Sequence, residues 1–298
     1  MSPSSRANRS EPNVDALHTF RLGDFEITII SEGNVYGDPA IVFEGTDESV
    51  WRPLTTLDEQ GRIVFGLNII LIRTNDRLIL LDTGIGEPSE AREHFETMFP
   101  FSPHLPLLYA FDRLEISPNA VTDVVYSHVH ADHIMGTTVE RDGERVPAYP
   151  NARHYMHRAD GGHIPERPDR KANYNLHIPV LREHGLFTLI EDRHEIAPGM
   201  TTIHAPGESP GHILVRLESR GEILYYVGDL FHDPCEAEHI DFVWPGRDRE
   251  AMIPSREDLI DRAVRENALL IAAHTPFPGI ARIGRSSDGI DWQVIDKP

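Results

Sequence analysis

The stretch Tyr-Ser-His-Val-His-Ala-Asp-His at residues 126–133 places three histidines and an aspartate within six positions. It directly follows residues 121–125, a mainly apolar run that predicts a buried strand. Each buried imidazole nitrogen needs a partner, so such a cluster is costly to assemble for packing alone. A metal ion would supply that partner. The sequence therefore predicts a strand that ends at a metal site.

The spacing of these residues suits one metal site. Residues two apart at an extended strand end face the same way, so His128 and His130 can point at one ion. Asp132 suits a helix N-cap, and a turn there would bring Asp132 and His133 back to the same point. Imidazole nitrogens and carboxylate oxygens are zinc-type ligands, and the cluster lacks the thiolates typical of closed structural sites.

The composition limits the class of protein. A chain of 298 residues with 40% hydrophobic content can bury a core as one large domain or as two intimate halves. The net charge of −20 argues against nucleic acid and anionic membrane surfaces as partners. A single cysteine, Cys235, permits no intramolecular disulfide. We find no signal peptide at the start and no apolar run of about 18 to 20 residues, so a cytoplasmic location is expected.

The chain is predicted to contain a disordered tail at residues 1–17 and one domain at residues 18–298. Residues 158–175, which are polar and broken by glycine and proline, are the predicted seam between two halves. The expected strands and helices are a half-buried strand at 25–30 stopping at Gly33, a hairpin of 66–74 with 77–81, a helix at 87–98, strands at 151–155 and 200–204, a hairpin of 213–217 with 223–227, a helix at 255–267 and a strand at 268–272.

Two irregular segments carry large apolar side chains. Residues 37–62 form a polar loop with Phe43 and Trp51, which either anchor the loop or line a pocket. Residues 99–111 are rich in Phe, Pro and Leu, and their prolines prevent a long helix. This second segment is predicted to cover the site as a hydrophobic lid, with core packing or a homodimer surface as the rival interpretations.

Four further elements end in polar residues that suit a metal site. The turn Asp82-Thr83-Gly84 follows a predicted strand, where Asp82 either orients a metal ligand or caps the turn. His212 follows two Pro-Gly pairs that force a tight loop. Asp229 lies at the exit of the 213–227 hairpin, where a buried carboxylate needs opposing charge. His274 follows the last predicted strand directly.

The order of these residues resembles the dinuclear metal signature of metallo-β-lactamase-fold hydrolases. The resemblance covers the chain from about His18 to its end, including the Asp82-Thr83-Gly84 turn. It implies an α+β fold, a four-layer αβ/βα sandwich with ligands on loops at one edge. It also implies that His128, His130 and His212 hold the first metal, that Asp132, His133 and His274 hold the second, and that Asp229 bridges both.

The resemblance implies a metal-dependent hydrolase. Two divalent ions, with zinc as the default and Mn, Fe or Co as alternatives, would generate a bridging hydroxide that attacks a carbonyl or phosphoryl centre. The resemblance is greatest to the methyl-parathion-hydrolase-like and quorum-quenching lactonase groups. Lactonases usually carry Pro-Gly-His-x-Pro-Gly-His, but Glu208 replaces the first of those histidines here. They also commonly place a tyrosine where this chain has His232.

The expected function is hydrolysis of a small-molecule lactone or ester, with an acyl-homoserine lactone as one example. A phosphotriesterase is the alternative, and a β-lactamase or a non-hydrolytic metal or redox protein ranks lower. Asp132 is predicted to shuttle a proton as well as bind metal. His232 is predicted either to donate to a substrate oxygen or to pack as a strand-end histidine.

Overall fold

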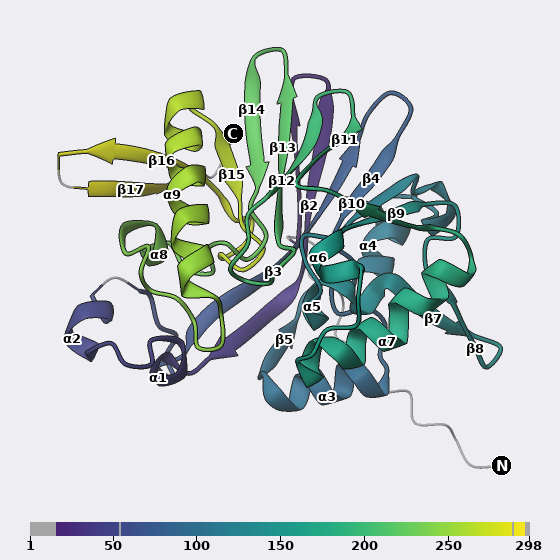
Figure 1. The fold of residues 1–298 in the computed structure, drawn as a ribbon, viewed down its shortest axis with the longest axis horizontal. Coiled ribbons are helices and arrows are strands. Elements are labelled where there is room, and N and C mark those ends of the chain that lie inside the picture. Colours follow the sequence, from purple (N-terminus) through teal and green to yellow (C-terminus); the bar gives the residue numbers. More distant parts are fainter. Residues whose placement is uncertain (1–15, 54, 288, 296–298) are drawn as a thin grey trace.

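Two mixed β-sheets pack face to face in the computed structural model, with helices on both outer faces (Figure 1). The structure describes residues 16–53, 55–287 and 289–295. The predicted tail therefore falls outside the described residues apart from its last two positions, and the first strand begins at Leu17. Among the described residues, no helix has the length and apolar character needed to cross a membrane.

The first sheet is built from the N-terminal part of the chain. Its strands are, in spatial order, β1 (Leu17–Leu22), β2 (Phe25–Gly37), β3 (Ile63–Arg73), β4 (Leu78–Leu81), β6 (Asp123–Val125), β9 (Arg153–His157) and β10 (Phe187–Ile190), with β5 (Phe101–Pro103) also paired to β2. The predicted 66–81 hairpin is confirmed as β3 and β4. The predicted stop at Gly33 is wrong, because a bulge between Ser31 and Gly33 lets β2 continue its pairing with β3.

The second sheet contains the rest of the strands that frame the site. Their spatial order follows the chain: β11 (Arg193–Ala197), β12 (Met200–His204), β13 (Ile213–Ser219), β14 (Glu222–Tyr226), β15 (Leu269–Ile271), β16 (Ile280–Ser286) and β17 (Gly289–Val294). The predicted 213–227 hairpin is confirmed as β13 and β14. The chain passes from one sheet to the other at residues 191–192, so the predicted seam at 158–175 is wrong. That segment contains α6 (Arg158–Gly161) and the start of α7 (Pro168–Glu183), both of which contact strands of the first sheet.

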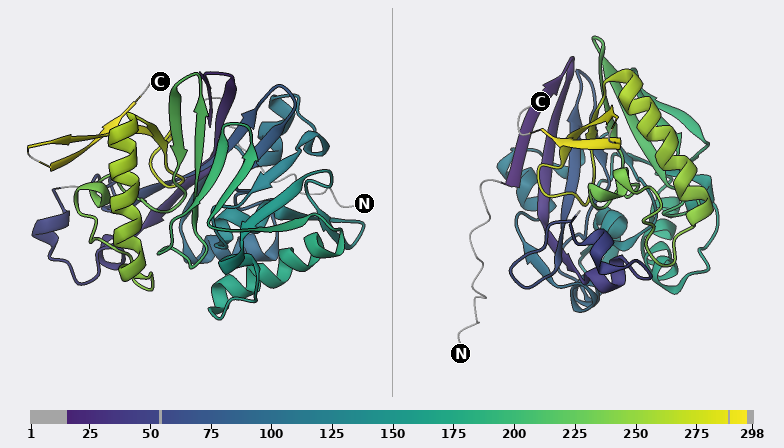
Figure 2. Two further views of the ribbon diagram at one scale, coloured as in Figure 1. Left: turned by 45° about the horizontal axis from the view of Figure 1, so that its top comes forward. Right: turned by 90° about the vertical axis from the view of Figure 1, so that its left-hand side faces the viewer.

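Helices complete the four layers (Figure 2). On the outside of the second sheet lies α9 (Arg249–Glu266), which begins six residues before its predicted start because Asp248 caps it by accepting from Ala251 N–H. The first sheet is covered by α4 (Leu107–Arg113), α5 (Ala131–Ile134), η3 (Met135–Thr137) and α7. The shorter elements are α1 (Pro39–Val42), α2 (Glu48–Trp51), α3 (Glu90–Met98), η2 (Pro118–Ala120), β7 (Thr138–Arg141), β8 (Glu144–Pro147) and α8 (Cys235–Glu238).

Three apolar layers hold this sandwich together. The central layer lies between the sheets and combines residues such as Ile27, Ile70 and Leu81 with Val215 and Tyr226, all buried. One outer layer joins the first sheet to its helices, and the other joins the second sheet to α9. This is the predicted four-layer αβ/βα arrangement. Its strand ends converge at one edge, where the polar cluster lies.

The two irregular apolar segments have different roles. Phe43 and Trp51 are buried and stack with ring centroids 5.0 Å apart, so they anchor their loop and do not line the site pocket. Residues 99–111 divide between two roles. Phe99 lines the site pocket, whereas Leu107 and Phe111 are buried in the first outer layer. The lid interpretation thus applies only to the start of this segment.

Candidate metal centre

Parallel strand pairs deliver the polar side chains to one edge of the sandwich. The first sheet pairs β4 with β6 in parallel, and the second pairs β14 with β15. Asp82 and the 126–133 stretch follow the first pair, while Asp229 and His274 follow the second. Because the carboxyl ends of parallel strands share an edge, four segments distant in sequence meet there.

Asp229 lies at the centre of this cluster. Asp229 is 2% exposed, and imidazole nitrogens of His128, His133, His232 and His274 surround its carboxylate. His133 Nε2 lies 3.1 Å from Oδ1, whereas His274 Nε2 and His128 Nε2 lie 3.1 Å and 3.5 Å from Oδ2. Burial alone would raise the pKa of Asp229, but His133 and His274 hold it well below its usual value. The carboxylate is therefore an anion that faces both halves of the site.

Asp132, His133 and His274 form a second group of possible ligands. One ligand atom from each lies within 4.8 Å of the others. Asp132 is not the predicted N-cap, because α5 begins at Ala131, two residues before the start that such a cap implies, and His130 occupies the cap position. Asp132 instead lies in the first turn of α5, which brings its carboxylate within 3.5 Å of His274 Nε2. The turn therefore has the predicted effect, although it begins at a different residue.

Asp82 contacts His133 through the ring nitrogen that does not face Asp229. Its carboxylate lies 2.8 Å from His133 Nδ1 and accepts from Ser127 N–H and from the Tyr226 hydroxyl. This arrangement leaves His133 Nε2 directed at Asp229. The structure therefore favours the interpretation of Asp82 as an orienting group over that of a turn cap.

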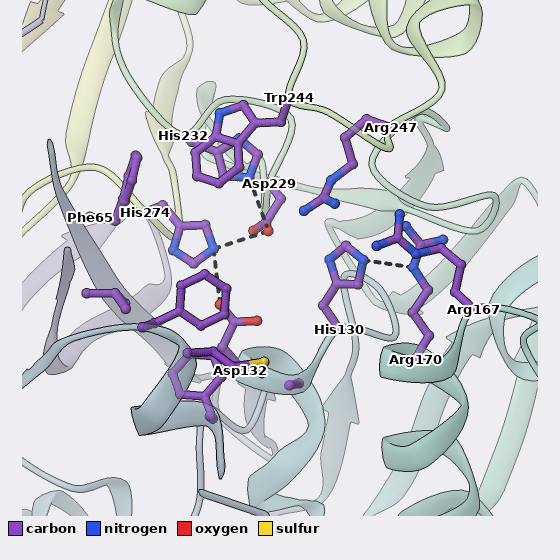
Figure 3. Close-up of a pocket in the computed structure, with 15 residues that line it drawn as sticks. Phe65, His130, Asp132, Arg167, Arg170, Asp229, His232, Trp244, Arg247 and His274 are labelled. Atoms are coloured by element: carbon purple, nitrogen blue, oxygen red, sulfur yellow. Dashed lines mark hydrogen bonds and ion pairs between the residues drawn. The ribbon is translucent and has the colours of Figure 1, made fainter. Parts of the chain in front are cut away.

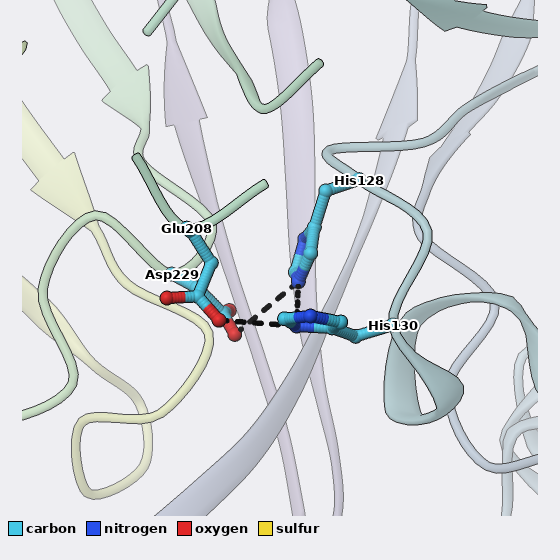
Figure 4. Close-up of side chains that lie close together, drawn as sticks. All are labelled: His128, His130, Glu208 and Asp229. Atoms are coloured by element: carbon cyan, nitrogen blue, oxygen red, sulfur yellow. Dashed lines mark hydrogen bonds and ion pairs between the residues drawn. The ribbon is translucent and has the colours of Figure 1, made fainter. Parts of the chain in front are cut away.

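His128, His130, Glu208 and Asp229 form the first group of possible ligands (Figure 4). His128 Nε2 lies 2.7 Å from His130 Nδ1, and the Glu208 carboxylate lies 3.0 Å from the same nitrogen of His130. Sequence reasoning noted Glu208 only as a replacement for a histidine. Its position in a loop forced by two Pro-Gly pairs was the available signal.

The structure does not bring His212 into either group of ligand atoms among the described residues. His212 is fully buried at the start of β13, where its Nδ1–H donates to the Ala205 carbonyl. The remaining lone pair on Nε2 accepts from the backbone N–H of Asp229 at 3.1 Å. The His212 ring centroid nevertheless lies 5.4 Å from that of His128, so the Pro-Gly loop places both Glu208 and His212 beside the first group.

The donor set fits a pair of cations. His133 Nε2 and Asp229 Oδ1 are buried and have no well-aligned hydrogen bond among the described residues. Such atoms are costly to leave without a partner. The sets combine imidazole nitrogen with carboxylate oxygen, which suits zinc, manganese, iron and cobalt.

A pocket of about 220 Å³ opens onto these residues (Figure 3). One wall is apolar and is formed by Val35, Phe65, Phe95, Met98, Phe99 and Trp244. The opposite wall contains three arginines that sequence reasoning missed: Arg167, Arg170 and Arg247. They come from the start of α7 and from the loop before α9, so no local motif marks them.

His232 lines the same pocket. Its Nε2 lies 3.5 Å from Asp229 Oδ2, and its ring stacks on Trp244 with centroids 4.5 Å apart. Burial lowers the pKa of His232, but hydrogen bonding to Asp229 and Glu236 outweighs burial and raises it to about 10. His232 therefore contacts the carboxylates of Asp229 and Glu236, and one face of its ring packs on Trp244.

Comparisons with known proteins agree with this geometry. The model of the metallo-beta-lactamase superfamily matches residues 62–274. An N-acyl homoserine lactonase of Bacillus cereus is 25% identical over 216 residues, covering 68% of this chain and 79% of the relative.

Two solved structures share the fold. The dizinc quorum-quenching lactonase AidC, in complex with a product, aligns with a TM-score of 0.78 and 22% identity over 95% of this chain and 98% of its own. The hydrolase AbOPH of the beta-lactamase superfamily aligns with a TM-score of 0.79 and 20% identity over 96% and 99%. The predicted fold and the prediction of a metal-dependent hydrolase are confirmed. On its motifs, its fold and the family match, the chain belongs to the metallo-beta-lactamase superfamily.

Proposed function

We propose that this chain is a dinuclear metal-dependent hydrolase that opens lactones, with acyl-homoserine lactones as the leading substrate class. The observation that carries the proposal is the pocket, which joins an apolar wall to the carboxylates of Asp132 and Asp229. An acyl chain can pack against the apolar wall, which would place an ester carbonyl beside the carboxylates of Asp132 and Asp229. The lactonase names of relatives such as the one from Bacillus cereus support this substrate class.

The residues divide between two ions, for which zinc is the default. His128, His130 and the buried His212 would hold one ion, Asp132, His133 and His274 would hold the other, and Asp229 would serve both. When bound, two such ions lower the pKa of water toward neutrality and polarise a substrate oxygen. The protein contributes the fixed geometry, since Asp82 orients His133 and the Gly66 carbonyl accepts from His274 Nδ1 at 2.9 Å.

Other side chains handle the substrate. The side chain of Asp132 is 17% exposed at the pocket floor, where it can hold a proton transferred during ring opening. His232 offers a donor beside Asp229, and its stacking on Trp244 fixes the direction of that donor. Phe65, Phe99 and Met98 give the acyl side of the pocket its apolar surface.

A substrate panel with the metal-loaded enzyme tests this proposal. It pairs acyl-homoserine lactones of short and long chain and simple γ- and δ-lactones with aryl esters, aryl phosphotriesters and β-lactams. We expect the highest kcat/KM for lactones, with a preference for longer acyl chains that Phe99→Ala reduces. Higher kcat/KM for phosphotriesters, or no lactone turnover by protein with two bound ions, would overturn the substrate assignment.

The variant Asp229→Ala tests the metal assignment in the same assay. Turnover and bound metal should both fall more than about 100-fold. Loss of a group that only supports a metal ligand costs about 10- to 100-fold, and Asp229 is proposed to bind metal directly. Intact turnover and metal content in Asp229→Ala would show that the assignment of Asp229 is wrong.

A further inference from the structure

Three arginines form one wall of the site pocket, and the proposed hydrolysis does not use them. This arginine wall consists of Arg167, Arg170 and Arg247, and it faces the apolar wall across the pocket (Figure 3). The chain as a whole has a net charge of −20, so its composition does not account for three positive side chains at one place. The arginine wall therefore needs a local explanation.

Backbone contacts hold the arginine wall in place. Arg167 donates to the Gly246 carbonyl at 2.8 Å, and Arg170 donates to the Glu208 carbonyl at 2.8 Å. A Cβ on Gly246 would lie 2.8 Å from Arg167 Nη1, so glycine at this position leaves room for the contact. The start of α7 is thus joined to the loop before α9 and to the loop before β13, and the guanidinium groups are fixed at the pocket.

The acidic residues described around the arginine wall offset only part of its charge. Glu208 is fully buried with Oε1 2.5 Å from Arg247 Nε, and it neutralises one positive charge. Among the described residues, the carboxylates that line the pocket are Asp132 and Asp229. Both belong to the candidate metal site, where bound ions would add further positive charge.

The arginines also repel one another. Arg170 is 8% exposed, and burial lowers its pKa, with the positive charges of Arg167 and Arg247 acting in the same direction. Like charges held together in a partly buried wall cost free energy, and such arrangements gather at functional sites. A bound anion would offset this cost.

The contact between Arg170 and His130 adds to the need for an anion. Arg170 Nε donates to His130 Nε2 at 2.8 Å, whereas His130 Nδ1 faces His128. A metal ion bound at Nδ1 would leave the proton of the neutral ring on Nε2, which can then no longer accept from Arg170. The Arg170 donor would need another acceptor.

We propose that the arginine wall binds a carboxylate group of the substrate, so that the pocket prefers lactones that carry an anion. This inference rests on the proposed function and narrows its substrate class. In Figure 3 the carboxylates of Asp132 and Asp229 lie between the arginine wall and Phe65. A substrate can therefore place an apolar group on one side, its ester at the centre and an anion on the other side.

The chemistry of the guanidinium group favours a carboxylate. Its planar fork of donors matches the two oxygens of a carboxylate, and it stays charged at neutral pH. Acyl-homoserine lactones carry no carboxylate, so a lactone with both an apolar group and a carboxylate should be the better substrate. In the rival role the arginines only join the loops to α7 and neutralise Glu208, and no substrate group contacts them.

A matched pair of substrates separates the two roles. Both are γ-lactones with the same alkyl substituent, and a second ring substituent is a carboxylate in one and its primary amide in the other. The readout is the ratio of their kcat/KM values, because damage common to both substrates cancels in a ratio. The variants are Arg167→Gln, Arg247→Gln and Arg167→Lys, which keeps the charge. Arg265→Gln on α9, with a side chain 63% exposed, is the matched control.

The parent should prefer the carboxylated lactone at least about tenfold, mainly through a lower KM, because the carboxylate makes charge-assisted hydrogen bonds. Arg167→Gln and Arg247→Gln should each reduce this preference, Arg167→Lys should retain more of it than Arg167→Gln, and Arg265→Gln should keep the parent ratio. The preference should also weaken as salt rises from about 0.01 M to about 1 M, since the Debye length falls from about 30 Å to about 3 Å.

Binding of the corresponding γ-lactams, which resist hydrolysis, gives a second readout that does not depend on turnover. Isothermal titration calorimetry should show tighter binding of the carboxylated γ-lactam than of its amide by the parent. This difference should shrink in Arg167→Gln and Arg247→Gln.

A parent without a carboxylate preference would overturn the proposal. A preference that stays unchanged in both glutamine variants would overturn it as well, because the carboxylate would then bind elsewhere, for example at the metal ions. Hydrolysis of neutral lactones without any carboxylate preference would refute this inference and leave the proposed function intact. Arginine-dependent binding of the carboxylated γ-lactam by a chain that hydrolyses no lactone would refute only the proposed function.

Discussion

At the scale of single residues, the site depends on buried carboxylates whose charges are opposed at close range. Asp229 has four imidazole nitrogens within 3.5 Å, and Glu208 has Arg247 and His130. Glu32 differs, because its carboxylate is buried beside the Asp82-Thr83-Gly84 turn and accepts from the backbone N–H groups of Ile85 and Leu107. Burial raises the pKa of Glu32 to about 7 against the opposing effect of these N–H groups.

Glu32 should therefore make stability depend on pH. Between its usual pKa of 4.5 and about 7, the folded chain holds a proton that the unfolded chain has released. This group thus lowers the free energy of unfolding as pH rises through that window. Relative to the parent, Glu32→Gln should gain about 2.5 kcal/mol between pH 5 and pH 8.

Urea unfolding at several pH values, at saturating metal, measures this difference. Exposed Glu257→Gln on α9 is the control for loss of one surface charge. Parallel pH curves for Glu32→Gln and the parent would contradict the prediction.

At the scale of elements, short turns after parallel strands set the positions of the ligands. The turn after β4 packs directly against α5 and η3, since Thr83 N–H and hydroxyl both donate to the carbonyl of His133 in α5. Gly136 in η3 allows this close approach. A Cβ on Gly136 would lie 2.0 Å from the Thr83 carbonyl oxygen, which is backbone and cannot swing aside. The position of His133 thus depends on a glycine three residues later.

Gly136→Ala should separate these two segments. We expect a loss of about 1 to 3 kcal/mol in the free energy of unfolding, together with weaker metal binding, because His133 moves with the segment. Gly284→Ala is the matched control, since its Cβ would meet only the end of the Gln293 side chain at 3.3 Å. Chemical denaturation and metal titration of both variants measure the effect. Equal costs for the two substitutions would show that the contact with Thr83 is unimportant.

At the scale of the whole molecule, the candidate metal site lies between the two halves of the sandwich. The first sheet supplies His128, His130, Asp132 and His133, and the second supplies Asp229 and His274. Ions bound between them would bind the folded chain but not the separated segments, so they should stabilise the packing of one sheet on the other.

Chelation should therefore lower thermal stability. At free metal 100 times the dissociation constant, one ion contributes about 2.7 kcal/mol, and each kcal/mol shifts the Tm of a domain this large by about 2 to 4 °C. Calorimetry before and after chelation should show a drop of several degrees that added zinc reverses. A Tm that stays constant while elemental analysis confirms metal removal would refute this link.

The sequence by itself determined the features that depend on local spacing. The His-x-His-x-Asp-His pattern, the two hairpins and the strand-end positions of Asp82, Asp229 and His274 follow from residues close in the chain. Tertiary structure decided the rest. Glu208 meets His130 across 78 positions, the three arginines reach the pocket from two distant segments, and His212 binds a backbone amide. These contacts depend on how the two sheets pack, and strand periodicity and turn chemistry do not encode that packing.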